Sequence, residues 1–249
     1  MPIFNESQTL ETHNIGHFGY SAVPLDELDA AQFTLATIVV DRSTSTNGFT
    51  REMTDAVKAS IEALKRHPLK DQMLVRVLAF DSTMEEIHGF IPVTAIDPSQ
   101  YEGCFVARGM TALFDACISA VEATESFSAS LASKKYLNNA IVIVVTDGAN
   151  NEGKFCNSSD VVEVKKAFAN AMLRESLESL VTILIAVNYK ALKDGLNAFL
   201  ADAGFTNPLI GVEQATPDSI ARIGNFITSS ISSTSMVLGT GGPSKTLNF

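Results

Sequence analysis

The feature that most limits the possible folds of this sequence is a set of short apolar runs separated by segments of helical periodicity. These runs are rich in β-branched residues and cover Phe33–Val40, Met73–Phe80, Ala140–Val145 and Leu180–Val187. Apolar runs of this length, without polar alternation, are typical of strands buried on both faces of a parallel sheet. Alternation of such strands with helices predicts an α/β domain with helices on both faces of the sheet.

The remaining elements follow from spacing and from turn residues. Apolar residues recur at helical spacing in segments that begin near Phe49, Met110, Val161, Leu192 and Pro217. Two shorter segments, Glu86–Val93 and Pro208–Val212, are predicted as strands. The link between Phe80 and Glu86 is too short for a parallel crossover, so we expect an antiparallel strand at an edge.

The chain is expected to contain three parts. Residues 1–31 are polar and weakly patterned, and we interpret them as an N-terminal extension. Residues 32–231 show no internal repeat and no linker, which indicates one domain. Residues 232–249 are rich in Ser, Thr and Gly, which is typical of a flexible C-terminal tail.

The net charge and the cysteine content limit the partners and the cellular compartment that we expect. A net charge of −10 disfavours nucleic acid and anionic membrane surfaces as partners, because both are negatively charged. No apolar run approaches the roughly 20 residues that span a bilayer, and the first residues lack the pattern of a secretory signal. The three cysteines have no metal-type spacing. We therefore expect a cytoplasmic protein with free thiols.

Carboxylates and hydroxyls gather where the predicted strands end. The first strand is followed by Asp41, Ser43 and Ser45, and the run Ala140–Val145 is followed by Asp147. Thr111 lies at the start of the helix that is expected to begin near Met110. In open α/β sheets, ligands bind beyond the carboxyl ends of the strands. Oxygen donors of this kind suit Mg²⁺, Mn²⁺ or Ca²⁺ and do not suit zinc. Two carboxylates would balance a divalent ion, and neutral hydroxyls would leave it able to attract one more anionic oxygen.

These residues resemble the metal-ion-dependent adhesion site of von Willebrand factor A domains. Asp41, Ser43 and Ser45 match the Asp-x-Ser-x-Ser motif, although Thr44 stands where many members have Gly. Thr111 is similar to the threonine of the second loop of that family, and Asp147 lies in a similar Thr-Asp-Gly strand end. The resemblance covers residues 33–231, and its motifs come in the order of the family.

The resemblance implies a fold, a metal and a partner. The fold is a doubly wound, mostly parallel six-stranded sheet of order 3-2-1-4-5-6, in which strand 3 is antiparallel. Hydroxyls such as those of Ser43, Ser45 and Thr111 bind the ion directly, and carboxylates such as Asp41 and Asp147 often bind through water. The last ligand position takes an Asp or Glu side chain of a partner protein. The expected function is thus a metal-dependent protein-interaction module without enzymatic activity.

Intracellular bacterial and phage members of the family fit the absence of a signal and of paired cysteines. Residues 226–233 are similar to the close of tellurium-resistance-type proteins with this domain, which suggests a stress or assembly system. Other intracellular relatives work with AAA+ ATPases, so such an ATPase is a further candidate partner.

Two other functions stay open. One is a Mg²⁺-dependent hydrolase or phosphotransferase on a Rossmann-like fold, which would need a second acid where Ser43 stands. The other is a scaffold that binds no metal. A further hypothesis concerns four basic residues near the loops, which would steer an acidic partner to the ion: Arg42, Arg51, Arg108 and Lys154.

Overall fold

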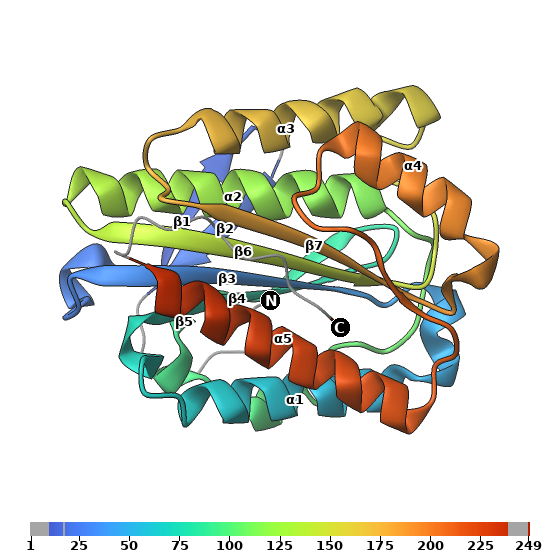
Figure 1. Cartoon of the computed structure of the whole chain (residues 1–249), viewed down its shortest axis with the longest axis horizontal. Helices are drawn as coiled ribbons and strands as arrows, with labels where there is room; N and C mark the ends of the chain where they lie inside the picture. Colours follow the sequence, from blue (N-terminus) through green and yellow to red (C-terminus); the bar gives the residue numbers. More distant parts are fainter. Residues whose placement is uncertain (1–9, 17, 239–248) are drawn as a thin grey trace.

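The apolar runs form the centre of an eight-stranded mixed sheet in the computed structural model of the chain, which describes residues 10–16, 18–238 and 249 (Figure 1). The strand order is β1-β2-β5-β4-β3-β6-β7-β8. The strands are β1 (Glu11–Ile15), β2 (Phe18–Ala22), β3 (Gln32–Asp41), β4 (Met73–Phe80), β5 (Met84–Pro92), β6 (Leu137–Thr146), β7 (Leu180–Val187) and β8 (Ile210–Val212).

Strands β3, β4 and β6 form the most buried part of the sheet. Strand β3 pairs in parallel with β4 on one side and with β6 on the other, and β7 and β8 continue the parallel pairing. Every residue of β4 is buried, as are all residues of β3 and β6 after the first of each. Such strands carry no polar alternation because both of their faces are covered.

The expected six-stranded, mostly parallel doubly wound sheet is wrong. The sheet has eight strands, and two of its strand pairs, β1–β2 and β4–β5, are antiparallel. Strand β5 pairs antiparallel with β4 as expected, but its other side pairs with β2 at Phe90 and Ala22, so β5 is not the outermost strand. The two additional strands have five residues each, and β1 is largely exposed, so neither shows the long apolar run of a buried strand.

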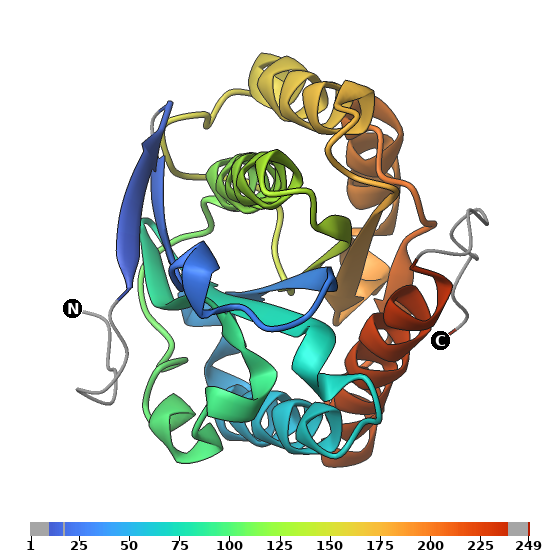
Figure 2. The same ribbon diagram turned by 90° about the vertical axis from the view of Figure 1, so that its left-hand side faces the viewer.

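Helices cover both faces of the sheet (Figures 1 and 2). One face carries α2 (Leu113–Ser133), α3 (Val161–Leu173) and α4 (Lys193–Ala203), and the other carries α1 (Thr50–Lys65) and α5 (Pro217–Val237). Short 3-10 helices occupy several connections: Leu25–Glu27, Thr44–Gly48, Lys70–Gln72, Val93–Ala95, Pro98–Tyr101, Ser158–Asp160 and Tyr189–Ala191. None of the described helices is long and apolar enough to cross a membrane.

Strands β1 and β2 form a hairpin that packs closely on β5. A Cβ atom at Gly89 would lie 1.9 Å from the Ser21 carbonyl oxygen, so only glycine permits this approach. The Glu86 carboxylate accepts hydrogen bonds from the Ser21 amide and hydroxyl, at 2.9 and 2.6 Å. The same carboxylate pairs with the fully buried Arg76 at 2.6 Å. Polar groups thus help to attach the hairpin, in addition to the buried Tyr20, and an apolar sequence pattern does not reveal them.

The division into extension, domain and tail stays a prediction, but two of its parts contain regular structure. The segment predicted as the extension includes β1 and β2, and the segment predicted as the tail begins inside α5, which continues to Val237. Residues 1–9 of the extension and 239–248 of the tail lie outside the described residues. The predicted start of α5 is confirmed, because Thr216 caps the helix by accepting a hydrogen bond from the Ser219 amide at 3.2 Å.

Candidate functional site

Backbone hydrogen bonds hold four segments together at the carboxyl ends of β3, β4 and β6. We call this region the rim and define it as residues 41–45, 81–85, 108–112 and 146–152. The Arg108 amide donates to the Arg42 carbonyl at 2.8 Å, and the Thr44 amide donates to the Gly109 carbonyl at 3.1 Å. The amides of Asn151 and Glu152 donate to the Thr111 carbonyl at 3.0 and 3.2 Å. Segments about one hundred residues apart in sequence therefore share one rim.

The five predicted ligands do not all touch, but four of them belong to one hydrogen-bonded cluster. The Ser43 amide donates to Asp41 Oδ1 at 2.7 Å, and the Ser43 and Ser45 hydroxyl oxygens are 3.0 Å apart. Ser45 Oγ donates to Asp147 Oδ1 at 2.6 Å, which joins the loop after β3 to the loop after β6. We call Asp41, Ser43, Ser45 and Asp147 the acid–hydroxyl cluster.

Thr111 lies beside this cluster. A Cβ atom at Gly148 would lie 3.0 Å from Thr111 Oγ1, so the Thr111 hydroxyl packs against the residue that follows Asp147. The backbone of Thr111 is held on both sides, because its amide donates to Asn151 Oδ1 at 2.8 Å and its carbonyl accepts from the 151 and 152 amides. Thr111 is buried, and its hydroxyl donates to no acceptor within the described part of the chain.

Burial raises the pKa of both carboxylates. Desolvation raises the pKa of Asp41 to about 6, although hydrogen bonds from Thr146 and Ser43 favour the charged form, and the nearby Asp147 raises the pKa further. Burial also raises the pKa of Asp147, against a hydrogen bond from Ser45. Two buried acids that repel each other are stabilised by a nearby cation.

No such cation is supplied by the described residues. Asp41 and Asp147 accept hydrogen bonds from neutral hydroxyls and amides, and neither forms an ion pair within the described ranges. A cluster of three or more His, Cys, Asp or Glu side chains suited to a metal is also absent from those ranges. The acid–hydroxyl cluster has another composition, with two carboxylates and several hydroxyls. This donor set fits a hard divalent cation, because its ligands are all oxygen.

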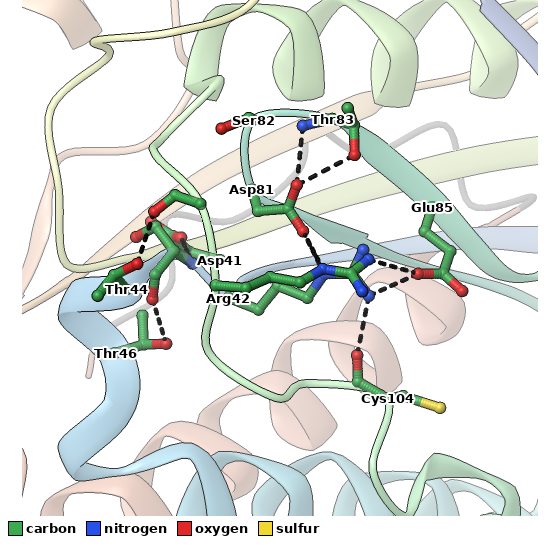
Figure 3. A network of polar contacts seen from close by, with 12 residues as sticks. Asp41, Arg42, Thr44, Thr46, Asp81, Ser82, Thr83, Glu85 and Cys104 are labelled. Carbon is green, nitrogen blue, oxygen red and sulfur yellow. Dashed lines mark hydrogen bonds and ion pairs between the residues drawn. The ribbon is translucent and has the colours of Figure 1, made fainter.

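A second group of charged side chains lies next to this cluster and is neutralised internally (Figure 3). Asp81 Oδ2 accepts from Arg42 Nε at 2.9 Å and from Arg108 Nε at 2.8 Å. Glu85 Oε2 pairs with Arg42 Nη1 at 2.6 Å and with Arg108 Nη2 at 3.2 Å. We call Arg42, Asp81, Glu85 and Arg108 the ion-pair cluster. Asp81 also accepts hydrogen bonds from the amide and hydroxyl of Thr83, and so stabilises the turn between β4 and β5.

The ion-pair cluster accounts for the charges of Arg42 and Arg108 without the predicted steering role, which stays a prediction. The Arg42 side chain is 3% exposed, and its guanidinium points into the protein. Arg108 is more exposed, but its charge is shared between Asp81 and Glu85. Both arginines therefore balance acids of this chain.

Several residues that shape the rim were not predicted as site residues. Thr146 Oγ1 donates to Asp41 Oδ2 at 2.5 Å, which connects the ends of β3 and β6. Asn150 Oδ1 accepts from the Phe114 amide at 2.9 Å in the first turn of α2. The buried Asp115 accepts from the amides of Lys154 and Phe155. Thr146 lies inside the Thr-Asp-Gly motif, so its role could have been inferred, whereas Asp115 looks like an ordinary helical acid.

Comparison with known proteins identifies the class of fold. No family model and no curated protein matches this sequence. Solved structures do match: the PilB minor pilin from Streptococcus sanguinis has a TM-score of 0.59 at 12% identity, over 89% of this chain and 66% of that chain. A von Willebrand factor type A protein from Catenulispora acidiphila has a TM-score of 0.55 at 12% identity, over 92% of this chain and 52% of that one.

A third structure is a single domain of the same kind. The von Willebrand factor domain of the type V pili tip protein Mfa5 from Porphyromonas gingivalis has a TM-score of 0.52 at 9% identity, over 82% of this chain and 96% of that chain. The chain thus spans nearly all of this domain, two thirds of PilB and about half of the Catenulispora protein. At these identities the likeness defines the fold, and the chain has a von Willebrand factor A-like fold.

Proposed function

We propose that this chain is a metal-dependent protein-binding domain. Asp41, Ser43, Ser45, Thr111 and Asp147 would hold Mg²⁺, or Mn²⁺ or Ca²⁺, and the ion would accept an Asp or Glu side chain of a partner protein. The observation that carries the proposal is the pair Asp41 and Asp147: both are buried at the rim, and neither has a cation within the described ranges. An external divalent ion would supply the missing positive charge.

The neutral donors explain why such an ion would bind a partner. Ser43, Ser45 and Thr111 contribute no charge, so two carboxylates would balance the ion without adding an excess of negative charge. The ion would then attract a further carboxylate from outside the chain. Ser45 is exposed, and the site is therefore accessible from solvent.

The structural neighbours support a binding role over an enzymatic one. The minor pilin and the pili tip protein are named as components of pili, and neither name describes a catalyst. The hydrolase or phosphotransferase alternative would need a second acid at position 43, where the serine hydroxyl accepts or donates a hydrogen bond with Ser45.

The cellular setting is a separate proposal. The predicted cytoplasmic location, with an AAA+ ATPase or another stress-system component as partner, rests on the sequence. The pilus neighbours suggest the cell surface as the competing location. Fractionation of the native cells, followed by detection of the chain, would decide between the two.

Calorimetric titration tests the metal site directly. Metal-free protein should release or absorb heat on titration with Mg²⁺ and with Mn²⁺, at a stoichiometry of one ion per chain. Asp41→Asn should lose this binding because it removes a carboxylate charge. Thr111→Ala should lose it because it removes a hydroxyl oxygen. Asp202→Asn changes an exposed carboxylate on α4 and should bind as the wild type does.

A pull-down from the native cell with and without EDTA would then name the partner. Absence of metal binding in the titration, with the protein shown to be folded, would reduce the chain to an α/β scaffold. Turnover of generic phosphoesters that is abolished by Asp41→Asn would favour the enzymatic alternative.

A further inference from the structure

An apolar pocket is lined in part by rim residues that follow Asp147 and by the first residues of α2. It has a volume of about 360 Å³ and lies between the start of α2, the loop 149–158 and α4. Its lining includes Leu113, Phe114, Asn150, Cys156, Leu196 and Phe199. A volume of this size is at the lower end of the range for small-molecule sites, and it suits one large side chain.

The walls of this pocket are held in place by internal contacts. The rings of Phe114 and Phe199 stack with their centroids 5.0 Å apart, and both side chains are 8% exposed. Asn150 spans the two sides of the opening: its Oδ1 accepts from the Phe114 amide, and its Nδ2 donates to the Phe155 carbonyl, both at 2.9 Å. The pocket is therefore preformed, and a ligand would not need to order it.

The pocket shares two segments with the five proposed metal ligands. Asn150 follows Asp147 by three residues, and Phe114 follows Thr111 by three residues. One residue of extended chain spans roughly 3.3–3.6 Å. A partner whose carboxylate reaches the proposed ion could thus place a side chain one to three residues away into the pocket.

The residues that line the pocket determine which kind of side chain it would accept. No Lys, Arg, Asp or Glu is among the described residues that line the pocket. A charged group would lose its hydration there without gaining an ion-pair partner, whereas an apolar group gains from burial.

We propose that this pocket is a specificity subsite for a Leu, Met or Phe side chain of the partner, placed within three residues of the acid that binds the metal. The inference rests on the proposed function, because the carboxylate–metal contact brings the apolar residue to the pocket. It adds a second requirement to the partner: a linear segment that combines an acid with a nearby large apolar residue.

The test selects peptides from a random displayed library on the Mg²⁺-loaded protein and elutes them with EDTA. Peptides recovered from the wild type should contain an Asp or Glu and, within three residues, a Leu, Met or Phe. Replacing that apolar residue by Ala in a synthetic peptide should weaken binding by about ten-fold or more, because a large apolar side chain would no longer be buried.

A variant that fills the pocket separates the two requirements. Gly195 lines the pocket in α4, and a Cβ atom there would meet open space. Gly195→Phe should therefore fill the pocket without strain, and removal of a glycine from a helix favours folding. This variant should still select acid-containing, EDTA-eluted peptides, but without the apolar preference. Gly195→Ala leaves the pocket open and should select as the wild type does.

The possible outcomes distinguish the two proposals. An acid preference without a neighbouring apolar preference, or an apolar preference unchanged in Gly195→Phe, would overturn the subsite and leave the metal site intact. Absence of any peptide eluted by EDTA would overturn the proposed function, and the subsite with it. A thermal midpoint of Gly195→Phe at or above that of the wild type shows that a changed selection does not come from unfolding.

Discussion

Two groups of acids lie at the same rim, and they differ in what neutralises them. In the ion-pair cluster, Asp81 and Glu85 each contact two arginines of the chain itself. In the acid–hydroxyl cluster, Asp41 and Asp147 contact hydroxyls and amides. Burial of a carboxylate without a cation costs folding free energy. The ion-pair cluster is thus neutralised within the chain, whereas the acid–hydroxyl cluster would be neutralised by the cation of the proposed function.

The largest expected effect comes from breaking the ion-pair cluster. Asp81→Asn should lower the free energy of unfolding by about 3 kcal/mol, because it leaves the buried Arg42 guanidinium without one of its two acids. The matched variant Asp41→Asn should cost less than about 1 kcal/mol in EDTA, because no cation loses its partner. Urea denaturation of both variants measures the difference. Equal losses would show that the two clusters have the same structural role.

A smaller effect should appear when the pH is lowered in metal-free buffer. The pKa of Asp41 is raised to about 6 in the folded protein, so folding takes up a proton between about pH 6 and the unfolded pKa near 3.9. The free energy of unfolding should therefore rise by about 2 kcal/mol over this range, relative to Asp41→Asn. His88, whose pKa burial lowers to about 4, contributes equally to both proteins and cancels in the comparison.

The ion-pair cluster should respond to acid in the opposite direction. Burial alone would raise the pKa of Asp81, but hydrogen bonds from Arg108 and Thr83 and the charge of Arg42 hold it below its usual value. The stabilisation by Asp81 is thus complete above about pH 3.9 and is lost as the pH falls through the lower pKa of Asp81 in the folded protein.

Identical pH profiles for Asp41→Asn and the wild type would contradict the proposed difference between the clusters.

The smallest effect concerns Thr44, which links the loop after β3 to the loop before α2. Its hydroxyl and amide donate to the Gly109 carbonyl at 2.8 and 3.1 Å. Thr44→Gly removes the hydroxyl bond and adds backbone freedom, so the free energy of unfolding should fall by about 1 kcal/mol. Calorimetry on the same variant should still detect Mg²⁺, because Thr44 is not among the proposed ligands. Loss of metal binding would show that this link positions the ligands.

The sequence predicted the central strands and the positions of the rim residues well, because both depend on local patterns. Continuous apolar runs mark β3, β4, β6 and β7. Polar residues that directly follow one of these strands lie at the carboxyl edge of the sheet. Polar contacts between residues far apart in the sequence produce no comparable local pattern. Glu86 and Arg76, which attach the hairpin to β5, are separated by ten residues and show no periodic signal.

The end of α5 shows a second limit of sequence patterns. Its last turns are rich in serine, a composition that resembles a tail, yet Ser230, Thr234 and Ser235 are buried. Asn139 Nδ2 donates to the Thr234 carbonyl at 2.7 Å, and this contact from β6 supports the helix. Small polar residues can pack closely against a sheet, so tertiary contacts determine where this helix ends.

The added hairpin has a consequence for self-association. Strand β2 meets the nine-residue strand β5 at the pair Ala22 and Phe90, and the Phe90 carbonyl accepts a hydrogen bond from the Val23 amide at 3.0 Å. Among the described strands, the outermost are β1, with five residues and mostly exposed polar side chains, and β8, with three residues. Short or polar borders are poor templates for strand addition by another chain. The hairpin therefore occupies part of the free side of β5, and its removal should expose that part and make the protein more prone to aggregate.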